Sequence, residues 1–427
     1  MTIIGRVETQ GCGCDAPEQL AGLISIDEAL GRIARHAVAI NGTEPVSLLQ
    51  TKGRILAELV RASAMAPPFD NAAMDGYVVD TAAFTGDGPW TFSVADRVPA
   101  GVTPGVAISG NTAARIFTGA PLPPGADAVI RQEDACGTGG KVTFDQRPKR
   151  GLNVRLAGSD MQPGQVIVQA GARLGAREIA ACAAAGVGTV PVRRALRVGL
   201  LVTGSEVRAA GSERHGAEIW DVNTPMLCAV LNSPRIQLIH VGQVADSRDA
   251  LERDLADLLG KADLVVTTGG VSVGEEDHVK PALAALGADL HFSGVAIKPG
   301  KPVSYGCVGN SHWLGLPGNP LSAYVTWRVF GAALLRRLTG QNAPRVIRRH
   351  VVTAKAIQRK PGRCELRPAS VIGFDNQGRE VAGFEDAVHS GRVRRLPDAD
   401  GLIFLPAESD RLPAGALVEF LPFGEIL

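Results

Sequence analysis

The stretch "ADLVVTTGGVSVGEED" (residues 262–277) decides the fold that we expect for this chain. Its first half is apolar and β-branched, as in a buried strand, and a turn containing Gly269, Gly270 and Gly274 follows it. Such a turn presents consecutive backbone N–H groups that bind phosphate without a lysine, and Thr268 and Ser272 add hydroxyl donors. A plain strand-to-helix turn is the alternative interpretation. The carboxylates at 275–277 indicate a metal ion or an oxyanion reaction.

Continuous apolar strands alternate with helical patterns from about residue 196 to residue 340. We expect strands at 196–204, 236–244, 262–270 and 290–297, and helices at 224–232, 247–259 and 279–286. This alternation predicts a doubly wound, mostly parallel sheet covered on both faces, within an α/β domain that spans residues 195–340. Ligands of such sheets bind beyond the carboxyl ends of the strands.

Three carboxylates follow three strands of this sheet, namely Glu206, Asp246 and Asp277. Like charges in one cleft are costly unless a cation neutralises them, so a shared metal site is the sharper hypothesis. Oxygen ligands without a His or Cys cluster favour Mg²⁺ over zinc. The alternative is that the three acids act independently, with Asp277 capping the helix that follows it.

Two stiff loops near the same sheet, "IKPGKP" (297–302) and "GLPGNP" (315–320), add positive charge and prolines. Lys298 and Lys301 supply the charge, and rigid loops reduce the entropy lost when a small anion is fixed. Two ordinary proline turns are the alternative interpretation of these loops.

The rest of the chain divides into four further segments. Residues 1–24 read as a flexible N-terminus, and helices are expected over 25–37 and 47–60. Residues 25–61 and 155–194 together are expected to form a small helical and β linker or dimerisation domain, interrupted by a β-rich insertion domain at 62–154. Residues 345–427 predict a C-terminal β barrel or sandwich, after a hinge near Pro344.

Composition excludes several classes of function. The 44 basic and 43 acidic residues almost cancel and aromatic residues make up 4%, which argues against nucleic acid as a partner. No uncharged apolar run reaches about 18 residues, so no membrane span is expected. The seven cysteines are odd in number and irregularly spaced, which fits a reducing, cytoplasmic setting better than a disulfide framework.

Eight stretches, taken in order, resemble one family, the molybdopterin molybdenumtransferases, which are bacterial relatives of the gephyrin E domain. The resemblance runs from about residue 25 to the C-terminus, and eight motifs in one order are specific. They are "AAMDGY" (72–77), "FTGAPLPPGADAV" (117–129), "RLAGSDMQPG" (155–164), "LLVTGSE" (200–206), "IWDVN" (219–223), "VVTTGGVSVGEED" (265–277), "IKPGKP" (297–302) and "GLPGNPLSA" (315–323).

The resemblance implies an elongated homodimer that performs the last step of molybdenum cofactor synthesis. Adenylylated molybdopterin and molybdate enter, AMP leaves, and Mg²⁺ is required; molybdopterin adenylyltransferase and apo-molybdoenzymes are further implied partners. It also implies site residues: an acidic cluster binding metal and positioning water, substrate contacts from the partner's insertion, and a molybdate or phosphate pocket. These residues are Asp160, Glu206, Asp246 and Asp277 for the cluster, Asp75 and Thr118 for the insertion, and Lys298, Lys301, Pro317, Asn319 and Pro320 for the pocket.

Three positions depart from the family pattern: Ala72 replaces a common Ser, Ser205 an acid, and Gly294 stands near a common basic position. Two other functions therefore stay open from sequence. One is a carrier or scaffold that binds molybdopterin without chemistry, and the other is a molybdopterin adenylyltransferase. Molybdate-dependent AMP release is expected of the transferase, ATP-dependent adenylylation of molybdopterin of the adenylyltransferase, and tight binding without AMP release of the carrier.

Overall fold

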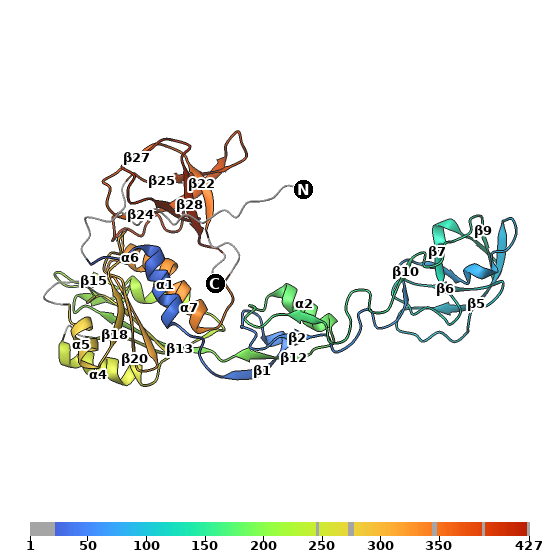
Figure 1. Ribbon diagram of the computed structural model, residues 1–427, viewed down its shortest axis with the longest axis horizontal. Coiled ribbons are helices and arrows are strands. Elements are labelled where there is room, and N and C mark those ends of the chain that lie inside the picture. Colours follow the sequence, from blue (N-terminus) through green and yellow to red (C-terminus); the bar gives the residue numbers. More distant parts are fainter. Residues whose placement is uncertain (1–21, 245–246, 272–276, 344–347, 387–388, 425–427) are drawn as a thin grey trace.

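The chain forms an elongated molecule in the computed structural model, which describes residues 22–244, 247–271, 277–343, 348–386 and 389–424 (Figure 1). An α/β domain and a C-terminal β domain lie together at one end, and a β-rich insertion lies at the other. A narrow linker joins them. Within the described residues, no helix combines the length and apolar character needed to cross a bilayer.

A six-stranded mixed sheet forms the centre of the α/β domain, in the order β16, β13, β17, β21, β20, β18. The first four strands pair in parallel, as their apolar runs predict. The last two pair antiparallel, so the sheet is less parallel than expected, because β20 and β21 form a hairpin. The bounds are β13 Leu196–Thr203, β16 Ile236–Val244, β17 Leu264–Thr268, β18 Asp289–Ser293, β20 Ser304–Val308 and β21 Ser311–Leu316.

Helices cover both faces of this sheet, as a doubly wound domain requires (Figure 1). One apolar cluster joins the sheet to α1, α3, α6 and α7, and a second joins it to α4 and α5. A π-helical turn at Trp327–Gly331 connects α6 to α7. The bounds are α1 Ile26–His36, α3 Asn223–Leu231, α4 Arg248–Leu259, α5 Val279–Ala285, α6 Pro320–Thr326 and α7 Ala332–Leu338.

Helix α1 packs on the central sheet, although the sequence assigned it to the linker domain. Ser25 caps the helix as expected, because its Oγ accepts a hydrogen bond from the Glu28 N–H at 3.1 Å. The apolar face formed by Ile26, Ala29 and Ile33 is buried in the same cluster as β13 and β17. Burial of this face, rather than proximity in sequence, decides to which domain the helix belongs.

The linker contains two short antiparallel pairs and one helix. Strand β1 (Thr43–Ser47) pairs with β12 (Thr189–Arg193), and β2 (Val60–Arg61) pairs with β11 (Val166–Val168). Helix α2 spans Ala176–Ala184. The helix expected at 47–60 is wrong: only a 3₁₀ turn, Leu48–Gln50, forms. Gly53 adopts a φ of 81°, and the N–H groups of Gly53 and Leu56 donate to Leu174 and Ala172 across the linker.

The insertion is a β domain, with a six-stranded sheet in the order β7, β4, β6, β5, β9, β8 and a separate pair β3–β10. Apolar clusters lie on the two faces of the sheet, so both sides of the strands β4, β6 and β7 are largely buried. The bounds are β3 Asn71–Ala72, β4 Gly76–Val79, β5 Trp90–Val98, β6 Thr112–Ile116, β7 Ala128–Arg131, β8 Cys136–Thr138, β9 Lys141–Phe144 and β10 Val154–Arg155.

The C-terminal domain is a closed barrel, one of the two forms that the sequence predicted. Strands β24, β25, β22, β28 and β26 pair in this order, and β26 closes the ring by pairing with β24. Strand β19 pairs with β24 and ties the loop at residues 297–302 to the barrel. The bounds are β19 Ile297–Lys298, β22 Arg349–Thr353, β23 Ile357–Gln358, β24 Cys364–Phe374, β25 Glu380–Phe384, β26 Gly401–Leu405, β27 Arg411–Leu412 and β28 Leu417–Pro422.

Candidate active site

A cavity of about 610 Å³ lies at the carboxyl ends of β13 and β17. The residues after each strand form its wall, and so do Pro317, Asn319 and Pro320 at the start of α6. A short parallel pair, β14 (Val207–Arg208) and β15 (Ile219–Trp220), forms the wall on another side. The position is the one expected for ligands of such a sheet.

The glycine turn after β17 is held tightly against β13. Gly269 has a φ of 88°, and a Cβ atom there would lie 2.5 Å from the Thr203 Oγ1, so only glycine fits. Its N–H donates to the Leu316 carbonyl at 3.2 Å and is therefore not available to an anion. The Gly270 N–H has no partner among the described residues, and Gly270 lines the cavity. Ser272 and Gly274, also predicted to bind substrate, lie outside the described residues.

Thr268 braces the cavity from within. Its buried Oγ1 accepts a hydrogen bond from the Asn223 Nδ2 at 2.8 Å and donates to the Pro317 carbonyl at 3.1 Å. This hydroxyl fixes the turn to α3 and to the loop before α6. The Thr268 hydroxyl therefore contributes to the site by holding the surrounding loops in position.

Three acids line the cavity: Glu206 after β13, Asp277 before α5, and Asp221 before α3. Asp221 Oδ1 also accepts a hydrogen bond from the Thr224 N–H at 2.9 Å. The structure thus brings together two of the three acids predicted to bind metal, and Asp246 lies outside the described residues. Among the residues that are described, no group of three or more His, Cys, Asp or Glu side chains could hold a metal ion by itself.

Lys298 and Lys301, predicted to line an anion pocket, are not among the residues that line the cavity. The Lys298 Nζ lies 3.6 Å from the Glu365 Oε2 on the barrel. Glu365 is buried, which by itself raises its pKa, but Arg367 and Lys298 lower the pKa below its usual value overall. Within a single chain, therefore, the Lys298 ammonium group lies next to a carboxylate of the barrel and not at the wall of the cavity.

Asp75 and Thr118 lie together on the insertion. The Asp75 Oδ1 accepts hydrogen bonds from the Thr118 N–H at 2.8 Å and from the Thr118 Oγ1 at 2.7 Å. These bonds lower the pKa of Asp75 below its usual value. The insertion lies at the far end of the molecule from the cavity (Figure 1). Asp160 is exposed on a turn of the linker, and its N–H donates to the Ala66 carbonyl at 3.0 Å.

At two of the three positions that depart from the family pattern, the local structure disfavours the residue that is common in the family. Ala72 is fully buried and pairs with Val154, so a larger side chain has no room there without rearrangement. Gly294 has a φ of 99°, and a Cβ atom would lie 2.7 Å from the Leu23 Cδ2. A basic residue at position 294 would therefore be strained in this backbone.

The sequence interpretation assigned no role to Trp220, Asp221 or Asn223, although it quoted them within "IWDVN". All three line the cavity. In the sequence these residues form a short polar and aromatic segment before a helix. That pattern does not show that the segment folds back beside β14. Only the pairing of β14 with β15 brings it to the carboxyl edge of the sheet.

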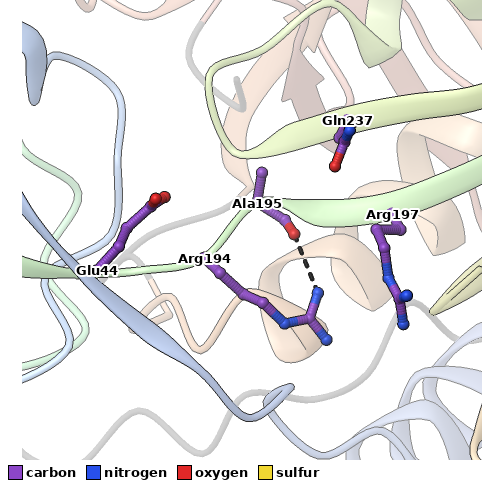
Figure 2. A pocket seen from close by; sticks show the side chains of 5 residues that line it. All are labelled: Glu44, Arg194, Ala195, Arg197 and Gln237. Atoms are coloured by element: carbon purple, nitrogen blue, oxygen red, sulfur yellow. Dashed lines mark hydrogen bonds between the residues drawn. The ribbon is translucent and has the colours of Figure 1, made fainter.

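A second cavity, of about 590 Å³, lies at the amino end of β13 and is lined by Glu44, Arg194, Ala195, Arg197 and Gln237 (Figure 2). Both guanidinium groups bind Asp263, just before β17, through hydrogen bonds of 2.7 to 3.4 Å. Burial alone raises the pKa of Asp263, but the bonds from Arg194 and Arg197 outweigh it and hold the pKa well below the usual range. The negative charge of Asp263 is therefore already neutralised.

Comparison with known proteins gives a consistent result along the chain. Three family profiles match: the MoeA N-terminal region (domain I and II) at residues 24–186, a probable molybdopterin binding domain at 199–337, and the MoeA C-terminal region (domain IV) at 350–423. The cavity and its three acids belong to the second of these segments.

Relatives and solved structures extend this similarity over nearly the whole chain. A molybdopterin molybdenumtransferase of Haemophilus influenzae is 32% identical over 95% of this chain and 100% of its own length. One of Nostoc sp. is 36% identical over 70% of each chain. The crystal structure of the molybdopterin biosynthesis moeA protein of Pyrococcus horikoshii has a TM-score of 0.80 at 26% identity, covering 94% of this chain and 100% of its own.

Proposed function

Because the chain belongs to the molybdopterin molybdenumtransferase family, we propose that it inserts molybdate into adenylylated molybdopterin and releases AMP. The observation that carries this proposal is the cavity at the carboxyl ends of β13 and β17, which a glycine turn and three acids line together. This is the arrangement that a reaction on a phosphoanhydride requires, because an oxyanion and a cation must be held side by side.

Mg²⁺ is the proposed cofactor, and the donor set fits it. Glu206, Asp221 and Asp277 offer only oxygen ligands. Mg²⁺ is usually held by one or two carboxylates together with substrate phosphates and water, so a complete protein cage is not needed. Glu206 and Asp277 would hold the ion, with Asp246 as the third predicted ligand. The bound ion would neutralise charge on the phosphates of the substrate.

The chain's own groups then have separate tasks. The Gly270 N–H donates to a phosphate oxygen, which the positive φ of the turn permits. Asp277 accepts a proton from the water that attacks the adenylyl phosphorus. The new P–O bond forms as the anhydride P–O bond breaks, the electron pair stays on the departing molybdopterin phosphate, and AMP is released. Molybdate would bind the two dithiolene sulfurs of the substrate, and the two thiol protons would leave with one molybdate oxygen as water.

The site is completed by a second subunit in this proposal. Asp75 and Thr118 lie too far along the molecule to serve the cavity of their own chain (Figure 1). In a symmetric dimer of elongated chains, the partner subunit's Asp75 and the partner subunit's Thr118 would reach the cavity. Lys298, Lys301 and Asp160 would contact molybdate or the substrate once the dimer has formed. The cytoplasm is the proposed location, and apo-molybdoenzymes and molybdopterin adenylyltransferase are proposed partners.

The experiment measures AMP release from adenylylated molybdopterin by the purified full chain, with molybdate and Mg²⁺ each present or omitted. We expect release only when both are present. Tight substrate binding without AMP release would contradict the proposal in favour of a carrier. ATP-dependent adenylylation of molybdopterin by this chain alone would contradict it in favour of an adenylyltransferase.

A further inference from the structure

An aromatic side chain stands exposed at the wall of the cavity. Strand β15 ends in Trp220, whose side chain is 51% exposed, next to Ile219 at 49% exposure. Both residues line the same cavity as the glycine turn and Glu206. An apolar surface of this kind, left exposed beside a polar cavity, is typical of a contact with a ligand or partner.

The indole of Trp220 is held in place by its own loop. The Arg214 guanidinium lies 4.3 Å from the ring centroid, and the Trp220 Nε1 donates to the Ser212 carbonyl at 3.2 Å. The Arg214 Nη1 in turn donates to the Glu218 carbonyl at 2.8 Å, and Glu218 pairs with Arg208 at 2.6 Å. A side chain fixed before the ligand arrives loses little entropy on binding.

A second observation concerns Asn223, which lies three residues further along and also lines the cavity. Its side chain is buried, with 7% exposure, and its Nδ2 is committed to the Thr268 Oγ1 and the Gly318 carbonyl. Its Oδ1 has no hydrogen-bond partner among the described residues. This oxygen is itself inaccessible from the cavity, so the amide acts within the wall, where it holds the Thr268 hydroxyl and the Gly318 carbonyl in place.

We propose that Trp220 positions the substrate by stacking on a fused-ring heterocycle. The inference rests on the proposed function, because that substrate carries two such heterocycles, a pterin and an adenine. A cavity of about 610 Å³ accommodates one of these ring systems with its phosphate at the glycine turn. Arg214 covers one face of the indole, and the heterocycle takes the other.

The first test uses the fluorescence of Trp220. The chain has four tryptophans, and Trp313 and Trp327 are buried. In a Trp90→Phe variant, Trp220 is therefore the one tryptophan open to the neutral quencher acrylamide. We expect AMP or neopterin monophosphate to reduce quenching about twofold, since stacking shields one face of the ring. In a variant that also carries Trp220→Phe, neither ligand should change the quenching.

The two probes identify the heterocycle. Protection by AMP alone assigns adenine to Trp220, and protection by neopterin monophosphate alone assigns the pterin. Protection by neither overturns the proposal. The measurement needs no turnover, so a chain that binds a probe but releases no AMP would contradict the proposed function and leave stacking supported.

The second test is kinetic. We expect Trp220→Ala to raise KM for adenylylated molybdopterin on the order of tenfold with little change in kcat, and Trp220→Phe to restore most of the loss. An unchanged KM overturns the proposal. So does a change in dimer mass for Trp220→Ala, because the indole would then be a subunit contact.

Discussion

The two ends of the central sheet carry cavities of nearly equal volume, about 590 Å³ at the amino end of β13 and about 610 Å³ at its carboxyl end. At the amino end, Arg194 and Arg197, which both line the cavity (Figure 2), share one acid, Asp263. At the carboxyl end, Glu206, Asp221 and Asp277 line one cavity, and no lysine or arginine is among the described residues that line it.

This difference shows that volume alone does not identify a site. A carboxylate that already has two guanidinium partners stabilises the fold and has little left to offer a ligand. Acids that gather in one cavity raise its electrostatic cost, and a protein retains them where a cation or a substrate neutralises them. The amino end of the sheet is therefore structural, and the carboxyl end is the candidate site.

The largest effect is expected at the carboxyl end, from Asp277→Asn. The variant keeps the size of the side chain but loses the charge, so we expect turnover to fall by about 10²–10³-fold. AMP release under saturating molybdate and Mg²⁺ measures this loss, and the melting temperature shows whether the fold is kept. Unchanged turnover would mean that the reaction does not need the Asp277 carboxylate.

A complementation experiment sharpens the comparison by asking whether this end is complete within one chain. Asp75→Asn and Asp277→Asn are each expected to be inactive. When equal amounts are dissociated and reassembled at random, about half of the dimers are mixed. Each mixed dimer has one intact site if each site takes Asp75 from one subunit and Asp277 from the other, so about a quarter of wild-type activity should return. No recovery, with mixed dimers demonstrated by mass, would contradict a shared site.

An Asp→Asn substitution at the amino end of the sheet, Asp263→Asn, is expected to lower stability and to leave catalysis unchanged. Asp263→Asn leaves Arg194 and Arg197 without their carboxylate, and we expect about 2 kcal/mol of lost stability. The loss is moderate because both guanidinium groups are partly exposed and stay hydrated when the carboxylate is removed. Denaturant unfolding measures this loss. Turnover per folded molecule should stay unchanged; a fall as large as that of Asp277→Asn would break the comparison.

The smallest effect concerns pH at the amino end, where the His312 N–H donates to the Asp263 carbonyl at 3.0 Å. Burial, with a smaller effect of His291, lowers the pKa of His312 to about 4. Its ring faces Tyr305 and Cys307, both uncharged at neutral pH. Between pH 6.5 and 4 only the unfolded chain binds this proton, so stability should fall as the pH is lowered, by on the order of 2 kcal/mol.

His312→Gln provides the matched control for this pH effect. Between pH 6.5 and 4, the free energy of unfolding measured with denaturant should fall less steeply for this variant than for the wild type. Equal acid sensitivity in the two proteins would show that His312 is not the group responsible.

Much of this molecule follows from local sequence. The apolar runs predict β13, β16 and β17, the periodic patterns predict α4 and α5, and the barrel is one of the two forms expected for the C-terminal domain. These elements were predictable because burial of apolar side chains fixes a period that is visible along the chain. The helix expected at 47–60 failed because long-range hydrogen bonds to the linker outweigh a local pattern.

The sequence by itself determined the family, the α/β class and the presence of acids after strands of one sheet. Only the tertiary structure decided that α1 packs on the central sheet, that Trp220, Asp221 and Asn223 join the cavity, and that Lys298 faces Glu365. The physical reason is that periodicity records which side of an element is buried, while contacts between distant segments depend on how whole elements pack together.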